Sequence, residues 1–150
     1  MSDDTLLDIA KRNLETANLV YEVKQDDEAF LNIVGYHLQQ TIEIGIKHYL
    51  ENHAIKYPFT HDIAELISLV PEEEISKFEK IEDMAGTITQ LEAKTRYVKN
   101  YRVTKRIVDK LLPIANTLIE DISQQDKKEA KQSISQDKEN IKIFSSSDAR

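Results

Sequence analysis

A scarcity of glycine and proline is the feature that most constrains this chain, because its 150 residues include three of each. An all-β fold with many turns needs these residues to reverse the chain repeatedly, so that class is disfavoured. Long helices are the alternative, and the length is typical of one domain with a substantial core. We therefore predict an all-α fold, an antiparallel bundle of four to five helices.

Apolar side chains at alternating three- and four-residue spacing locate the two longest helices near the start of the chain. Asp3 and Asp4 are predicted to cap the first, whose buried face would be Leu7, Ala10, Leu14, Ala17 and Tyr21. The second would run from about Asp27 or Glu28 to His53. Its wider stripe predicts a central helix packed on two sides: Leu31, Val34, Leu38, Ile42, Ile46 and Tyr49.

Shorter helices are expected in the second half. Thr60 is predicted to cap one that stops at Pro71. The acidic run 72–74 suits the first turn of another. Gly86 predicts a break before a helix over 87–99, and the last core helix would span 101–122 with a kink or restart at Pro113.

Two regions differ in composition. We expect residues 1–123 to form the helical bundle, whereas residues 124–150 are polar and predict a C-terminal extension that is helical or mobile.

Several functional classes are disfavoured by composition. The chain has no cysteine, so disulfides, a thiolate nucleophile and cysteine-based metal sites are excluded. No segment has the apolar length of a membrane span, and the first residues lack a secretory pattern, so we expect a cytoplasmic protein. His48, His53 and His61 lack the three- or four-residue spacing of a helical metal pair, and we expect no metal site and no cofactor.

Charge is distributed unevenly along the chain. The net charge is −7, and residues 60–93 carry two basic and nine acidic groups. The following basic segment, residues 94–110, carries seven basic groups and one acidic group, with Tyr97 and Tyr101 between the cations. Cations beside aromatic rings suit contact with phosphates and bases. A solvated helix face, or a seat for the acidic 60–93 segment, remains an alternative explanation.

Three stretches in order carry a resemblance to a known family. They are Tyr36-His37-Leu38-Gln39-Gln40-Thr41-Ile42-Glu43 with Lys47, then Thr60-His61-Asp62-Ile63 after Pro58, then Arg96-Tyr97. Together they resemble HEPN domains over about residues 5–123. The same residues have structural explanations: Glu43 and Lys47 form a favourable i,i+4 pair, and Gln39 and Gln40 suit hydrogen bonds across a helix seam.

The resemblance implies a bundle that is frequently a homodimer. Some members are metal-independent endoribonucleases that use an Arg, four to six intervening residues and a His. Others bind nucleotides or RNA, or pair with a small nucleotidyltransferase in two-gene toxin–antitoxin systems. In this chain no arginine is followed by a histidine at that spacing, because the arginines stand at 12, 96, 102, 106 and 150 and the histidines at 37, 48, 53 and 61.

We therefore expect a non-catalytic HEPN-like protein, with no catalytic residues assigned. It would bind a nucleotide, an RNA or a partner protein along the basic segment, through Arg96, Tyr97, Lys99, Arg102, Lys105, Arg106 and His61. Two alternatives remain: a divergent ribonuclease that uses His61 and Arg96, and an antitoxin-like module that binds only protein.

Overall fold

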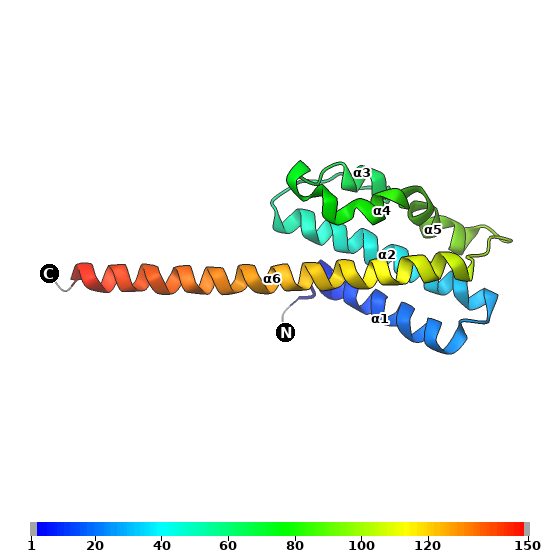
Figure 1. Cartoon of the computed structure of the whole chain (residues 1–150), viewed down its shortest axis with the longest axis horizontal. Helices are drawn as coiled ribbons and strands as arrows, with labels where there is room; N and C mark the ends of the chain where they lie inside the picture. The colour runs from blue at the N-terminus through cyan, green and yellow to red at the C-terminus, as the bar shows by residue number, and fades with distance from the viewer. Residues whose placement is uncertain (1–2, 149–150) are drawn as a thin grey trace. The chain divides into compact units, whose positions relative to one another are not determined.

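The computed structural model describes the backbone of residues 3–148 and the side chains of residues 3–142. Helices account for most of this part, and it contains no strand. In chain order they are α1 (Leu6–Lys24), α2 (Glu28–Asn52), α3 (Ile63–Ile67), the 3₁₀ helix η1 (Glu72–Phe78), α4 (Glu79–Asp83), α5 (Ala85–Tyr97) and α6 (Lys105–Asp148) (Figure 1). The prediction of an all-α bundle is confirmed. The six α-helices of residues 3–148 exceed the expected number because the segment after Pro71 forms both η1 and α4.

The chain divides into two compact units, residues 1–119 and residues 120–150. In the first unit, α1 and α2 lie side by side and antiparallel, and α5 packs against α2 (Figure 1). The part of α6 within this unit is tied to α1, because the Tyr21 hydroxyl donates to Asp109 and Asn18 donates to Asn116 at 3.3 Å.

The central position predicted for the second helix is confirmed. All six residues of its predicted stripe are buried, and Leu38, Ile42 and Ile46 are completely inaccessible to solvent. Gln39 and Glu43 on the same helix are also buried, with 0% and 3% of their surface exposed. A helix buried around so much of its circumference must place some polar groups inside, where they need partners.

Three predicted helix starts are wrong. Thr5, not Asp3 or Asp4, caps α1, because Thr5 and Asp8 form a reciprocal capping box. Asp62, not Thr60, caps α3, since its side chain accepts from the Glu65 backbone at 3.2 Å. Gly86 does not break the chain: Ile88 donates to the Met84 carbonyl at 2.9 Å, so Gly86 already belongs to the first turn of α5.

The last helix also differs from its prediction at both ends. It begins at Lys105, not Tyr101, and no restart occurs at Pro113, because the helix runs unbroken from Lys105 to Asp148. Leu111 and Ala115 on either side of the proline are completely buried, so packing offsets the missing hydrogen bond. Residues 124–148 are therefore helical, one of the two outcomes expected for the extension.

Candidate anion-binding site

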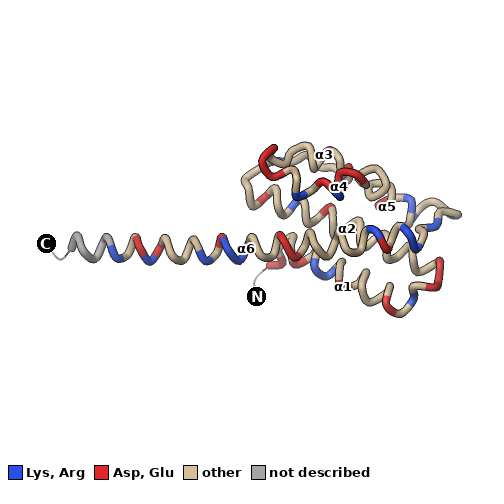
Figure 2. The backbone as a smooth tube through the Cα atoms, viewed as in Figure 1, with Lys and Arg blue, Asp and Glu red and all other residues tan. Residues whose placement is uncertain are grey.

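The basic segment is not one helix. It comprises the last turn of α5, the loop 98–104 and the first turns of α6. Figure 2 shows its lysines and arginines gathered where α5 ends and α6 begins, apart from the acidic residues of η1 and α4. The chain reversal between the two helices brings cations from both of them and from the loop to one end of the bundle.

A clamp from α2 holds the loop in place. The Asn32 side-chain amide donates to the Tyr101 carbonyl at 2.9 Å, and its oxygen accepts from the Val103 backbone N–H at 2.8 Å. Arg102 lies between these two bonded residues, so its backbone is fixed on both sides. Gly35, one helical turn further along α2, allows the close approach of Val103, because a Cβ at that position would stand 2.9 Å from Val103 Cγ2.

One pocket of about 330 Å³ opens between α2, α5 and the clamped loop, and we call it the Tyr36 pocket. Arg96 from α5 and Arg102 from the loop both line it. None of its lining residues is acidic: Ala29, Asn32, Ile33, Tyr36, His37, Thr95, Arg96 and Arg102. Two guanidinium groups in a concave site without carboxylates favour an anionic ligand with planar oxygen pairs, such as a phosphate or a carboxylate.

Arg96 is held in position by its surroundings. Its guanidinium lies 4.9 Å from the Tyr36 ring centre and 4.8 Å from the Tyr97 ring centre. It also pairs with Glu92, and its Nε donates to the Glu92 backbone carbonyl at 2.9 Å. The ion pair offsets part of its positive charge, so Arg96 contributes orientation as well as charge.

Arg102 has fewer constraints on its side chain. It is exposed, and its guanidinium donates to its own neighbour's carbonyl, that of Tyr101, at 3.0 Å. Among residues 3–142 it forms no ion pair. Its positive charge therefore remains available to a ligand.

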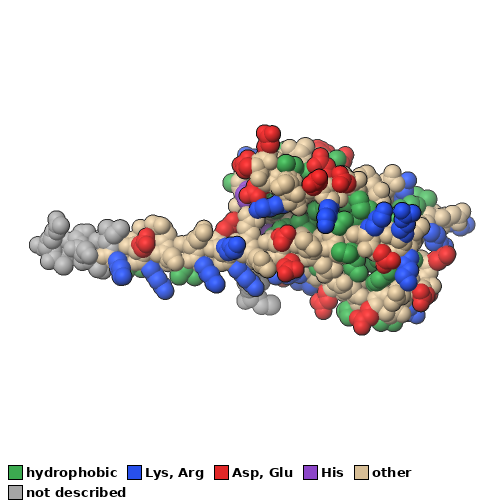
Figure 3. Space-filling view, in the orientation of Figure 1, with side chains coloured by type: hydrophobic (Ala, Val, Ile, Leu, Met, Phe, Trp, Pro, Cys, Tyr) green, Lys and Arg blue, Asp and Glu red, His purple; other side chains and the backbone are tan. Residues whose placement is uncertain are grey.

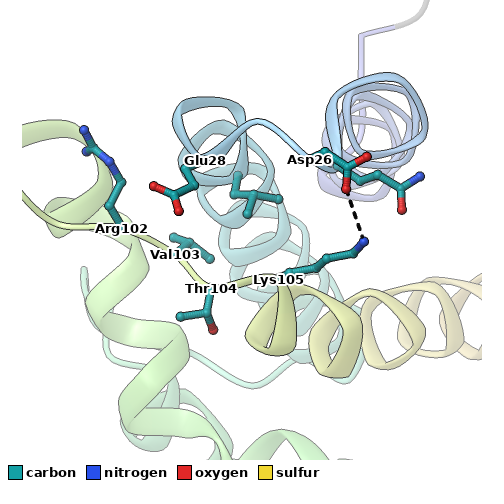
Figure 4. Close-up of a pocket in the computed structure, with 8 residues that line it drawn as sticks. Asp26, Glu28, Arg102, Val103, Thr104 and Lys105 are labelled. Carbon is teal, nitrogen blue, oxygen red and sulfur yellow. Dashed lines mark ion pairs between the residues drawn. The ribbon is translucent and has the colours of Figure 1, made fainter.

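A second pocket lies on the other side of Arg102, and we call it the Glu28 pocket. It has a volume of about 360 Å³ and mixes charges of both signs: Gln25, Asp26, Glu28, Leu31, Arg102, Val103, Thr104 and Lys105. Lys105 reaches across to Asp26 at 3.6 Å, whereas the Arg102 side chain extends away from that pair (Figure 4). Carboxylates within this pocket oppose the binding of an anion.

His37 adds shape rather than charge to the Tyr36 pocket. Its Nδ1 lies 2.8 Å from the Asn13 amide oxygen, and burial lowers the pKa of its imidazole below the usual 6.5. A neutral ring at physiological pH follows. The positive charge of the pocket therefore comes from its arginines.

His61 belongs to a different group of side chains, centred on the buried Glu43. Glu43 accepts from Gln39 at 2.8 Å, pairs with Lys47 at 3.1 Å and lies 2.9 Å from His61 Nδ1. These contacts confirm the predicted Glu43–Lys47 pair and satisfy a buried carboxylate that would otherwise be costly. The opposite ring nitrogen of His61 stands 4.0 Å from Glu92, the partner of Arg96.

The structure brings two of the predicted site residues, Arg96 and Arg102, into the Tyr36 pocket. Lys105 lines the Glu28 pocket instead. The remaining ones line neither pocket: Tyr97, Lys99, Arg106 and His61.

Sequence reasoning missed the α2 side of the site. Tyr36 and His37 had been noted only as part of a family motif, and Asn32 had not been noted at all. Helical spacing offered one signal, since Asn32, Tyr36 and the glycine at 35 stand three to four residues apart on one face of α2. Nothing in the sequence paired that face with residues about seventy positions away.

Two structural searches of the described residues returned nothing. No helix among them combines the length and apolarity that crossing a membrane requires. No three histidine, aspartate or glutamate side chains among them group closely enough to hold a metal ion.

The fold and the site define a class: an all-helical bundle with a cationic pocket at the end where its fifth and sixth α-helices meet. The sequence model of the HEPN domain matches residues 4–128, which is most of the chain. This protein belongs to the HEPN domain family. No curated protein and no solved structure shows a significant match.

Proposed function

We propose that this HEPN protein binds a nucleotide, free or within RNA, by its phosphate in the Tyr36 pocket. One observation carries the proposal: Arg96 and Arg102 line the same pocket, and none of its lining residues is acidic. Each guanidinium can donate two parallel hydrogen bonds to phosphate oxygens. The Asn32 clamp and the Tyr36 ring set both arginines in place before a ligand arrives, which reduces the entropy lost on binding.

Calorimetric titration of ATP into the wild-type protein at low salt tests the proposal. We expect saturable binding that Arg102→Ala weakens by about 10- to 100-fold, the value of one or two lost charge-assisted hydrogen bonds. Arg96→Ala should weaken it less, because Glu92 already neutralises part of that charge. Both variants should unfold at nearly the wild-type temperature, since these side chains are exposed.

Arg106→Ala is the matched control. Arg106 is an exposed arginine of the same basic segment that lines neither pocket, and its loss changes the net charge equally. We expect it to bind ATP like the wild type. Absence of saturable binding by the wild type, or equal losses in Arg102→Ala and Arg106→Ala, would contradict the proposal.

A second candidate function is ribonuclease activity by His61 and Arg96. Its support is that both side chains face Glu92, at 4.0 Å from the imidazole and in a direct ion pair with the guanidinium. Cleavage of single-stranded RNA that is lost in His61→Ala would favour this candidate. Intact RNA after long incubation with wild-type protein would exclude it.

The expected assembly also belongs to this proposal. We expect a cytoplasmic homodimer with a possible nucleotidyltransferase-type protein partner in a toxin–antitoxin system. Light scattering on the purified protein checks the dimer, and a mass equal to one chain at all concentrations would contradict it.

A further inference from the structure

The C-terminal part of α6 carries its lysines on one side. Every residue from 127 to 142 is exposed, and five of them are lysines: Lys127, Lys128, Lys131, Lys138 and Lys142. At 3.6 residues per turn these five fall within an arc of about 100°. The three acidic residues of the same stretch, Glu129, Asp137 and Glu139, point outside that arc. Figure 3 shows the lysine side chains projecting from one edge of this helix.

This arrangement differs from an ordinary solvated helix face. Solvated helices gain stability from a carboxylate placed four residues before a lysine, yet none of these five lysines has one. Lys127 and Lys131 are instead four residues apart, as are Lys138 and Lys142, and like charges at that spacing destabilise a helix. Among residues 3–142, none of the five takes part in an ion pair.

From these observations we propose that the lysine face of residues 127–142 binds the phosphodiester backbone of a nucleic acid strand. The lysines extend over about 22 Å of helix, a length along which nucleic acid presents many phosphates. Lysine ammonium groups are point charges suited to phosphates at variable positions, so the contact would be independent of base sequence. The inference goes beyond the Tyr36 pocket, which accommodates a single nucleotide unit.

The apolar side chains of this stretch argue against a lipid surface. Only Ile134 and Ile141 are large and apolar between residues 127 and 142, with 56% and 66% of their surfaces exposed. No aromatic residue accompanies them. Amphipathic helices that lie in membranes bury a broad apolar face, and two isoleucines do not provide one.

The test measures the binding of a fluorescently labelled oligouridylate to the full chain by anisotropy, as salt rises from about 50 to 200 mM. Contact with five phosphates gives a log–log salt slope of about −3.5 for a single strand, and replacing all five lysines by glutamine should remove that contribution. Unlabelled duplex DNA and anionic vesicles serve as competitors. Displacement by the duplex supports a general phosphodiester site, whereas displacement by vesicles alone would overturn the proposal.

Two controls separate the lysine face from net charge. The first replaces five lysines outside this helix stretch by glutamine: Lys11, Lys24, Lys56, Lys77 and Lys80. The second exchanges Lys131 with Gln132 and Lys138 with Asn140, which keeps the composition but moves two charges out of the arc. We expect the first control to keep the wild-type salt slope and the second to lose about two fifths of it. A wild-type slope in the second control would contradict the proposal.

ATP titration distinguishes a failure here from a failure of the proposed function. The variant without the five lysines should bind ATP like the wild type, because its Tyr36 pocket is intact. If Arg102→Ala alone abolishes oligouridylate binding and the lysine replacements change nothing, the lysine face is not a binding surface. If the lysine replacements abolish oligouridylate binding while no variant binds ATP, the nucleotide pocket fails and the lysine face stands.

Discussion

The two pockets on either side of Arg102 have similar volumes, about 330 and 360 Å³, and share this residue, yet they differ in what they can bind. The Tyr36 pocket adds Arg96 and no acidic residue. The Glu28 pocket adds Lys105, Asp26 and Glu28, and the lysine is already paired with Asp26. A single cation therefore does not define an anion site; the charges of its neighbours decide whether its field is reinforced or cancelled.

The largest expected effect comes from removing the clamp that serves both pockets. Asn32→Ala deletes two hydrogen bonds to the backbone around Arg102 and leaves the Tyr101 carbonyl and Val103 N–H without their partner. We expect ATP affinity to fall about tenfold or more, and the free energy of unfolding to fall by about 1–3 kcal/mol. Calorimetry and urea unfolding measure both quantities.

Asn32→Asp is the informative companion variant. It keeps an oxygen acceptor for the Val103 N–H but loses the donor to the Tyr101 carbonyl and adds a negative charge to the pocket. Its ATP affinity should be at least as low as that of Asn32→Ala. Wild-type affinity in both variants would show that the clamp does not position Arg102.

A smaller effect is expected from filling the space between α2 and the loop. Gly35→Ala places a methyl group 2.9 Å from Val103 Cγ2, in a buried position. Overpacking should lower the free energy of unfolding by about 1–3 kcal/mol, offset by up to about 1 kcal/mol of helix propensity. Chemical denaturation measures the net loss.

Gly86→Ala provides the matched control for that substitution. Gly86 also lies in a helix, but nothing stands within 4 Å of the position its Cβ would take. Here we expect a gain of about 0.5–1 kcal/mol. If both alanines stabilise the protein equally, the close approach of Val103 to α2 is not a constraint on the loop.

The third prediction tests the Glu28 pocket directly. Replacing its acids, in Asp26→Asn with Glu28→Gln, leaves Arg102 and Lys105 without opposing charge. We expect ATP affinity to rise by up to about fivefold, the range of exposed charge interactions. Glu15→Gln with Glu22→Gln on α1 makes the same change in net charge far along the chain. An equal rise in that control would mean that net charge, not the pocket, controls binding.

The smallest expected effect concerns pH. Burial lowers the pKa of His37, so the imidazole is neutral in the folded protein above its usual value of 6.5 and stays neutral somewhat below it. Between pH 8 and about 6.5 we therefore expect ATP affinity to change less than about twofold from this residue. Its depressed pKa also means that its contribution to stability is present above 6.5 and is lost as pH falls toward the folded-state value. A marked rise in affinity at pH 6.5 that His37→Gln removes would show a charged imidazole.

Helix positions were largely predictable because core burial has a period that the sequence displays. The stripe from Leu31 to Tyr49 is buried as predicted, and the start of α2 at Glu28 is correct. Caps were less predictable, since several residues compete locally: Thr5 and Asp62 each stand within two residues of the predicted cap. Their side chains reach the third following backbone N–H, a geometry that composition alone does not reveal.

The site was predictable only in part, because it joins residues that are far apart in the chain. The excess of basic residues in segment 94–110 identified Arg96 and Arg102 as candidates. Their convergence depends on the Asn32 clamp and on the missing side chain at Gly35, both on α2. These are tertiary contacts, and no local pattern in one sequence encodes them.

Backbone amide and Asn side-chain chemical shifts, followed by NMR during an ATP titration of the wild-type protein, test the central claim most directly. The account predicts that the shift changes concentrate on the Tyr36 pocket, at Asn32, Tyr36, Thr95, Arg96 and Arg102. Gln25, Asp26, Glu28 and Thr104 should remain nearly unaffected. Shift changes centred on those four residues, or no changes at saturating ATP, would contradict it.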